Sequence, residues 1–255
     1  MGKEFTTVEI DNKICRICQD GSETGSSKKC RLSIFYWGVA GKSEDLITAS
    51  MSYVCTHLRR QMLNVRFLIV AYESENWNDD FSPWKAQAVF GNEEFGGKAD
   101  KTLEWLMNKC IPYIDEAYVS YIKDALEIRR YAVGYSLAGL FSLWAYGECS
   151  LLTGAVSCSG SLWYKGWLEY VETHWAAFHR NRMDCIYLSL GSKEEKTKNS
   201  LLSTVGDNTR KTYKMLCGAP EGVRGALEWN AGGHFSDPGT RIAKGIYWIL
   251  STGGV

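Results

Sequence analysis

The chain alternates short apolar runs with longer segments in which apolar residues return every three or four positions. Short apolar runs are typical of buried strands, and the longer period is typical of amphipathic helices. Strands are predicted at residues 31–39, 65–72, 131–136, 154–161, 185–191 and 226–230, and helices at 43–63, 98–113, 137–146, 197–217 and 240–250. Because strands that alternate with helices favour a mainly parallel sheet, we expect an α/β fold with helices on both faces of the sheet.

The length of the chain limits how many domains it can form. Its 255 residues, 45% of them hydrophobic, suit one α/β domain over residues 1–255. Residues 1–30 predict lead-in antiparallel strands with a hairpin over 21–29.

One long segment, residues 73–97, follows an apolar strand, has no regular period and is rich in aromatic residues. Long loops within compact domains are usually functional, and ligands of open α/β sheets bind beyond the carboxyl ends of the strands. We therefore expect an active-site loop in which the rings of Trp77, Trp84 and Phe90 contact the substrate. A lid that packs its own aromatic side chains is the alternative.

Ser136 is the candidate nucleophile. An apolar strand pattern runs into Gly134-Tyr135-Ser136-Leu137-Ala138-Gly139, and a helix pattern follows. We interpret this segment as a nucleophile elbow of the G-x-S-x-G type, in which glycine gives the room that a serine on a tight strand-to-helix turn requires. A serine in an ordinary glycine-rich turn is the alternative.

A neutral serine is a weak nucleophile and needs a general base. Of the four histidines, His57, His174 and His179 lie in helical stretches, where packing or surface roles suffice. His234 follows the last predicted strand in a loop of small residues, which would leave its imidazole free beyond the sheet edge. We expect His234 to be the base.

A third group should fix the tautomer of the histidine. In folds with a nucleophile elbow, this acid follows the serine and precedes the histidine along the chain. The loop after the strand 185–191 offers Glu194 as the first choice and Glu195 as the second, and Asp207 could also reach the site. A mixed Glu/Lys loop is often only a solvated surface, so that alternative stays open.

The oxyanion of an acyl-transfer intermediate requires two backbone donors. One should be the N–H of Leu137, directly after the nucleophile. The other should come from the loop after the strand 31–37, where Gly38 and Val39 lie.

Charge and cysteine content narrow the function classes further. Lys and Arg number 29, as do Asp and Glu, so the formal net charge is zero, and no block of like charges offers a surface to nucleic acid or to a membrane. The nine cysteines are scattered, which suits reduced thiols without disulfides, and Cys15-Arg16-Ile17-Cys18 lacks a second ligand pair for zinc. Because no apolar signal segment occurs near the N-terminus, we expect a cytoplasmic protein. We also expect that it binds no metal and no other cofactor.

Four segments together resemble the α/β-hydrolase superfamily, and within it the esterase family that includes esterase D and the enterochelin esterases. The resemblance rests on residues 134–140, 77–84, 190–199 and 233–235, and it extends over roughly residues 30–250. It implies an α/β-hydrolase three-layer sandwich and serine-dependent hydrolysis of carboxylic esters, with Ser136 as nucleophile and His234 as base. Trp37-Gly38 stands where such chains often carry His-Gly at the oxyanion loop.

We therefore expect a serine esterase that acts on a small-molecule ester through an acyl-enzyme. Acyl transfer to another alcohol and ligand binding without turnover on a hydrolase scaffold are the alternatives. A siderophore lactone, a feruloyl-type ester, a sugar acetate and a short acyl ester all remain open as substrates, and a homodimer is compatible with the sequence.

Overall fold

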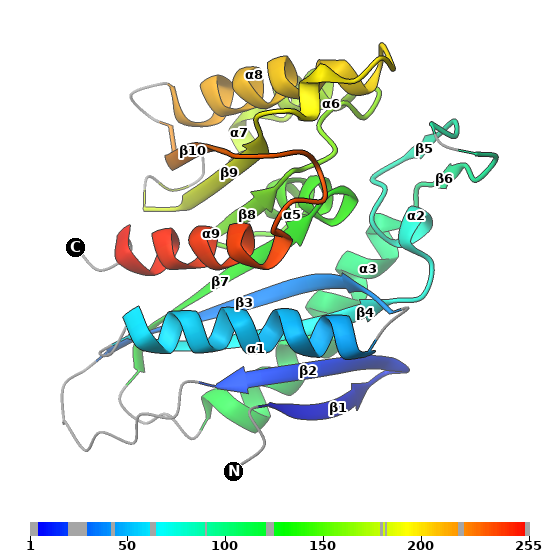
Figure 1. Ribbon diagram of the computed structural model, residues 1–255. Helices are drawn as coiled ribbons and strands as arrows, with labels where there is room; N and C mark the ends of the chain where they lie inside the picture. The colour runs from blue at the N-terminus through cyan, green and yellow to red at the C-terminus, as the bar shows by residue number, and fades with distance from the viewer. Residues whose placement is uncertain are drawn as a thin grey trace.

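An eight-stranded, mostly parallel sheet runs through the molecule (Figure 1). The computed structural model describes residues 5–19, 30–41, 44–61, 65–89, 91–120, 125–178, 181, 183–218 and 222–252. The hairpin expected at 21–29 and the side chain of Phe90 lie outside these residues. The strands are β1 (Thr6–Ile10), β2 (Lys13–Gln19), β3 (Cys30–Ala40), β4 (Arg66–Ser74), β7 (Ala125–Tyr135), β8 (Gly154–Cys158), β9 (Cys185–Gly191) and β10 (Arg224–Asn230).

The order of the strands brings several loops to one edge of the sheet. The sheet reads β1-β2-β4-β3-β7-β8-β9-β10, and every neighbouring pair from β4 to β10 is parallel. Among the described strands of this sheet, only the pairings of β2 with β1 and with β4 are antiparallel. Because parallel strands end on the same side, the loops after β3, β7, β8, β9 and β10 meet at one edge.

Helices cover both faces of the sheet, as the sequence predicts. In Figure 1, α1 (Glu44–Gln61) and α9 (Pro238–Thr252) cross the near face, where they pack on one apolar core with the sheet. The second core, on the other face, takes in α3 (Ala99–Trp105), α5 (Leu137–Glu148), α6 (Trp167–Thr173), α7 (Trp175–Phe178) and α8 (Val205–Cys217). The expected three-layer α/β architecture is confirmed.

Several element boundaries differ from those predicted. Strand β7 begins at Ala125, and the helix expected at 98–113 continues to Val119 through α4 (Ile111–Ile114) and two π-helical turns, Leu106–Cys110 and Asp115–Val119. Helix α8 begins only at Val205, because Asn199 Oδ1 accepts the N–H groups of Leu201 and Leu202 and forms a separate turn before it.

The aromatic-rich segment after β4 contains short regular elements that its sequence did not indicate. These are α2 (Trp77–Asp80) and a two-stranded hairpin of β5 (Lys85–Ala86) and β6 (Phe95–Gly96). Phe81 fixes the segment to the domain: its ring is fully buried, 5.3 Å from the ring of Phe141 on α5. The segment is thus anchored from within.

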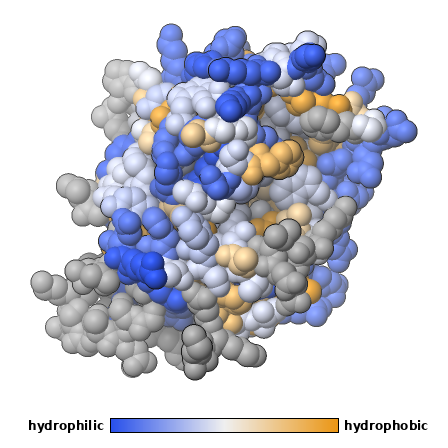
Figure 2. Space-filling view, in the orientation of Figure 1, coloured by the Kyte–Doolittle hydropathy of each residue, from blue (hydrophilic) through white to orange (hydrophobic). Residues whose placement is uncertain are grey.

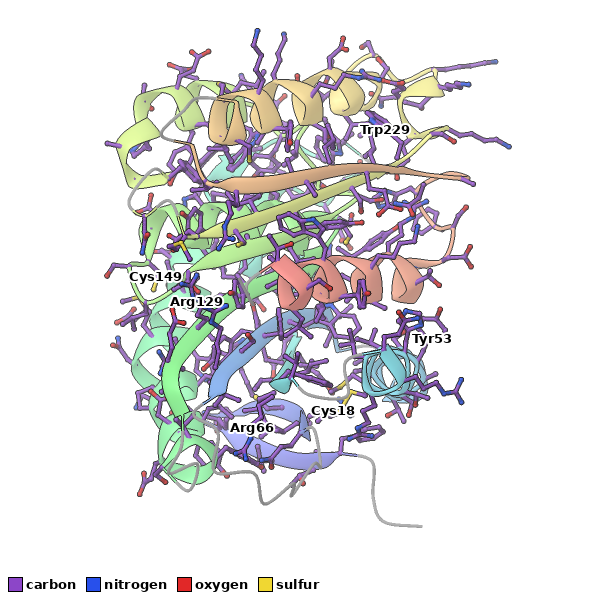
Figure 3. All side chains as sticks on the ribbon, turned by 90° about the vertical axis from the view of Figure 1, so that its left-hand side faces the viewer. Cys18, Tyr53, Arg66, Arg129, Cys149 and Trp229 are labelled. Atoms are coloured by element: carbon purple, nitrogen blue, oxygen red, sulfur yellow. A yellow bond between two sulfur atoms is a disulfide. The ribbon has the colours of Figure 1, made fainter. Side chains whose placement is uncertain are left out.

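The expectation that no cysteine forms a disulfide is wrong for one pair. Cys18 on β2 and Cys55 on α1 are joined by a disulfide, close to the label of Cys18 in Figure 3. The helix lies over the sheet face that carries Cys18, and this packing, rather than any spacing in the sequence, brings the two thiols together. Six further cysteines of the described chain are not joined in disulfides. Within that part, no three His, Cys, Asp or Glu side chains gather as a metal site would require.

The face seen in Figure 2 is mainly hydrophilic, with apolar residues in small separate groups. Among the described helices, none is both long and apolar enough to span a bilayer.

The docking of α9 gives a direct test of the near-face core. Ile246 is fully buried, whereas the next residue, Tyr247, is 37% exposed. Ile246→Ala should lower the free energy of unfolding by about 2–4 kcal/mol, because it removes buried methyl groups and leaves a cavity. Tyr247→Ala, the matched control, should cost less than about 1 kcal/mol. Urea unfolding measures both values, and equal losses would contradict the packing.

Candidate active site

Ser136 lies on a strained turn between β7 and α5. Its backbone has φ 57° and ψ −123°, which a non-glycine residue adopts only when its surroundings hold it there. A Cβ atom at Gly134 would come within 1.9 Å of the carbonyl oxygen of Ala138, so the position two residues before Ser136 must be glycine. The tight turn thus fixes the serine at the edge where the parallel strands end.

The elbow departs from strict G-x-S-x-G spacing. The residue two positions after Ser136 is Ala138, and the glycine follows at 139. A Cβ atom at Gly139 would lie 3.0 Å from the Cα atom of Gly160, so the close contact that requires glycine falls one residue later than the pattern suggests.

Ser136, His234 and Glu194 lie in hydrogen-bonded series, although 98 residues separate the first two along the chain. His234 Nε2 lies 3.0 Å from Ser136 Oγ, and His234 Nδ1 lies 2.7 Å from Glu194 Oε2. A hydroxyl, an imidazole and a carboxylate in this order can move a proton from the serine to the histidine while the carboxylate holds the other ring nitrogen.

The Glu194 carboxylate is buried and fully engaged. Its side chain is 4% exposed, and its Oε1 atom accepts hydrogen bonds from Ser159 Oγ at 2.6 Å, the Gly191 N–H at 2.6 Å and Arg241 Nη1 at 2.9 Å. Burial by itself would raise the pKa of Glu194, but the hydrogen bonds from His234, Ser159 and Gly191 and the charge of His234 outweigh it and hold the pKa below the ordinary value. The group is therefore a carboxylate at neutral pH.

Two residues that the sequence reasoning missed complete this cluster. Tyr135 Oη donates to the backbone oxygen of His234 at 2.5 Å, and burial raises the pKa of Tyr135 to about 12, so it stays a donor. Arg241 Nη1 donates to that same Tyr135 Oη at 3.0 Å. The sequence did carry a signal for Arg241: it lies on the apolar face of the last predicted helix. A charged side chain in such a place needs a buried partner.

Ser161 also borders the nucleophile, and the sequence reasoning did not select it. Its Oγ atom lies 3.5 Å from Ser136 Oγ, and its N–H donates to the Ser136 carbonyl at 3.0 Å. The side chain is 2% exposed. The loop after β8 therefore forms the wall next to the serine.

The other candidate acids point elsewhere. Glu195, the second choice, accepts two hydrogen bonds of 3.0 Å from Arg210, and Asp207 accepts a third, also of 3.0 Å, from the same side chain. Both carboxylates thus belong to a partly exposed cluster around Arg210 on α8. Of the three candidates, Glu194 alone is hydrogen-bonded to His234.

Gly38 and Val39 lie in strand β3, as the strand predicted at 31–39 implies, and not in a loop after residue 37 as expected for the oxyanion donors. Strand β3 continues to Ala40 because its pairing with β4 persists to the last residue, although its pairing with β7 ends at Trp37 and Val133. Gly38 is buried, and a Cβ atom there would come within 2.7 Å of the Phe81 ring. After Trp37, the β3 backbone therefore continues beyond its last pairing with β7. This stretch lies near the end of β7 that leads into Ser136.

The tryptophans of the segment after β4 are both half-buried and packed. Trp77 lies edge-on to Phe81, with ring centroids 4.9 Å apart, and lines an acidic groove of about 390 Å³. Trp84 donates from Nε1 to the Lys165 carbonyl at 2.8 Å and packs against Tyr164 and Tyr170. The contacts of Trp84 fasten the segment to the region that follows Ser161. Much of the surface of each ring therefore packs against other side chains.

The lowered pKa of Glu194 links the stability of the fold to pH. A carboxyl group whose pKa is lower in the folded chain adds stability above its ordinary value of 4.5, and this stability is lost as the pH falls through the folded value. The wild-type free energy of unfolding should therefore fall more steeply between about pH 5 and pH 3 than that of Glu194→Gln. Urea unfolding over this range measures the slopes. Glu195→Gln should keep the wild-type slope because its partly exposed ion pair is weak; equal slopes for the wild type and Glu194→Gln would contradict the account.

The chain can be compared with known proteins. Residues 39–231 match the family described as Putative esterase, and no curated protein matches the chain. The siderophore hydrolase EstA from Aspergillus nidulans has 15% identity and a TM-score of 0.75, with 98% of this chain and 95% of EstA covered. An IroE-like serine hydrolase from Shewanella oneidensis has 14% identity and a TM-score of 0.75, with 97% and 80% covered.

The siderophore hydrolase EstB from Aspergillus nidulans has 15% identity and a TM-score of 0.70, with 99% of this chain and 96% of EstB covered. At these identities the three structures establish a shared fold, and the family match, which spans most of the chain, establishes the class of enzyme. The chain therefore belongs to the Putative esterase family of α/β hydrolases and is a carboxylic ester hydrolase.

Proposed function

We propose that the protein hydrolyses small-molecule carboxylic esters through a Ser136–His234–Glu194 triad and an acyl-enzyme. The observation that carries the proposal is the series of contacts at 3.0 Å and 2.7 Å that links the hydroxyl, the imidazole and a buried carboxylate. The strained elbow supports the role of Ser136, because a turn of this kind holds a serine oxygen clear of the sheet.

The reaction proceeds in two acyl-transfer steps. Ser136 Oγ attacks the ester carbonyl while His234 Nε2 takes its proton, and Glu194 stabilises the resulting imidazolium through Nδ1. The tetrahedral intermediate then expels the alcohol, which takes the proton from Nε2. Water attacks the acyl-enzyme by the same route in the second step and releases the acid and the free serine.

Backbone N–H groups stabilise the oxyanion in both steps. The Leu137 N–H is at the first position of α5, where no carbonyl of the helix can accept it and where the helix dipole favours negative charge. The second donor is the N–H of Gly38 or Val39. The end of the β3–β7 pairing at Trp37 and Val133 supports it, because beyond that point the β3 backbone is free of the ladder with β7.

The substrate is an ester that reaches the edge between the loops after β4 and β8. Trp77 and Trp84 border this region and could contact an apolar acyl or alcohol group. The names of EstA and EstB support including a siderophore ester in a panel that varies the acyl and alcohol parts separately. Product analysis with added alcohols tests whether the acyl group goes to water or to another acceptor.

Ser136→Ala tests the nucleophile. It should lower kcat/KM for a short-chain p-nitrophenyl ester by at least about 10³-fold, because no acyl-enzyme can form. Stability should change little, and thermal unfolding checks this. A Ser251→Ala control, at an exposed position on α9, should keep wild-type activity. Hydrolysis by Ser136→Ala at the wild-type rate would remove Ser136 from the mechanism.

The choice between the two glutamates is tested by a matched pair of substitutions. Glu194→Gln should lower kcat/KM by about 10²–10⁴-fold, since an amide can neither fix the tautomer of His234 as a carboxylate does nor stabilise the imidazolium. Glu195→Gln should stay within about twofold of the wild type, because it removes only a partly exposed ion pair with Arg210. The reverse order of effects would make Glu195 the acid. Steady-state kinetics of both variants decide the matter.

A further inference from the structure

One buried side chain, Arg241, makes several hydrogen bonds behind the triad, all of them from its two terminal nitrogens. This residue lies in the first turns of α9 and is 1% exposed. Its Nη1 atom lies 2.9 Å from Glu194 Oε1, 2.6 Å from Ser159 Oγ and 3.0 Å from Tyr135 Oη, so its two N–H groups are shared among three acceptors. From Nη2 it donates to the carbonyls of Gly233 at 2.9 Å and Ala231 at 3.4 Å.

We propose that Arg241 is a positioning residue of the esterase site, whose guanidinium ties the acid of the triad to the loop that carries the base. The proposal rests on the proposed function of Ser136, His234 and Glu194. Arg241 touches neither the nucleophile nor the reacting atoms; it acts through Glu194 and through the backbone on both sides of His234.

The loop that carries His234 depends on such external contacts. Its residues before the histidine are Ala231, Gly232 and Gly233, which offer no long side chains, and Gly232 adopts φ 94°. Two bonds from Arg241 hold the carbonyls of this stretch, and Tyr135 Oη holds the carbonyl of His234 itself. Because Arg241 also binds Tyr135, one rigid planar group sets the position of the imidazole from both sides.

The end of β9 leaves room for this arrangement. A Cβ atom at Gly191 would lie 2.8 Å from both Arg241 Nη2 and Glu194 Oε1, and 2.7 Å from the Gly232 carbonyl. Any side chain here would push apart the arginine, the acid and the histidine loop. The last residue of the strand is therefore a glycine at the one point where the three meet.

Arg241 also sets the charge that His234 experiences. Beside the imidazole, Glu194 is a carboxylate and Arg241 a cation, so the pair carries no net charge. The other titratable groups near the guanidinium are Tyr135 and Cys158, and burial raises the pKa of each to about 12, so neither is charged at neutral pH. Glu228, which also acts on Cys158, is itself paired with Lys244 and Tyr187.

Loss of this positive charge should favour the imidazolium. The cation opposes the positive charge that His234 gains on protonation, and it shares the Glu194 carboxylate with the imidazole, Arg241 on Oε1 and His234 on Oε2. Removing the charge while keeping a hydrogen-bonding side chain should therefore move the acidic limb of the kcat/KM profile to higher pH, by on the order of one unit.

The test compares pH profiles of kcat/KM for three variants on the full chain. Arg241→Gln should lower the plateau by about 10- to 100-fold through misplacement of the triad and shift the acidic limb upward. Arg241→Lys keeps the charge but loses the planar fork, so its plateau should fall while its limb stays at the wild-type pH. Tyr135→Phe removes the bond to the His234 carbonyl and should behave as Arg241→Lys does.

The matched control is Arg129→Gln. Arg129 is 5% exposed and bonded to Glu127 and to the Met183 carbonyl, so its loss also removes a buried guanidinium. It lies seven residues before Ser136 on β7, about 20 Å away along the strand, toward the opposite end of the strands from Trp229 in Figure 3. Arg129→Gln should cost stability yet leave the acidic limb unmoved.

Each outcome bears on the proposal. An unshifted limb in Arg241→Gln, or a wild-type plateau in Arg241→Lys, would overturn the positioning role. If Arg241→Gln does not fold, the plateau of Arg241→Lys and of Tyr135→Phe decides. Failure of the proposed function would look different, because Ser136→Ala would then retain activity whatever Arg241 does.

Discussion

The site depends on one physical constraint: a carboxylate buried at the sheet edge must be compensated on all sides. Removing a charge from water costs several kcal/mol, and only good hydrogen bonds and an opposite charge offset that cost. Glu194 has an imidazole on one oxygen, and a hydroxyl, an amide and a guanidinium on the other. Because these donors come from the loop after β8, the end of β9, α9 and the loop after β10, the carboxylate holds together the segments that form the site.

The rest of the fold serves this arrangement. The parallel sheet brings the ends of β7, β8, β9 and β10 to one edge, and α9 packs across the sheet so that its first turns lie beneath that edge. Strain is concentrated there as well: Ser136 and Ser159 adopt φ of 57° and 45°, values that the surrounding bonds must maintain. The large apolar cores on both faces supply the stability that such a site requires.

Sequence patterns predicted those parts of the molecule that local chemistry determines. Strand β9 has the predicted bounds, since a continuous apolar run ending in glycine is decisive for a buried parallel strand. The elbow and the order serine, acid, histidine selected three side chains that the structure brings together at one edge. Each of these signals lies within a few residues of the chain.

Features that depend on packing between distant segments could not be read in this way. Arg241 and Tyr135 are hydrogen-bonded to each other although they lie 106 residues apart along the chain, and an arginine in a helix gives no indication of which acid it will meet. The disulfide of Cys18 and Cys55 depends on where α1 lies on the sheet. The packing of Trp84 depends on distant residues in the same way: its indole N–H donates to the Lys165 carbonyl, 81 residues away along the chain, and its ring packs against Tyr164 and Tyr170.

The central claim, that Ser136 is an activated nucleophile, is tested most directly by mass spectrometry after treatment with diisopropyl fluorophosphate. Trypsin should release residues 131–165 as one peptide that contains six serines, so fragmentation must locate the adduct within it. The account predicts one phosphoryl adduct, on Ser136, formed in step with the loss of esterase activity. An unmodified Ser136 in protein that has lost activity, or an adduct on another serine, would contradict it.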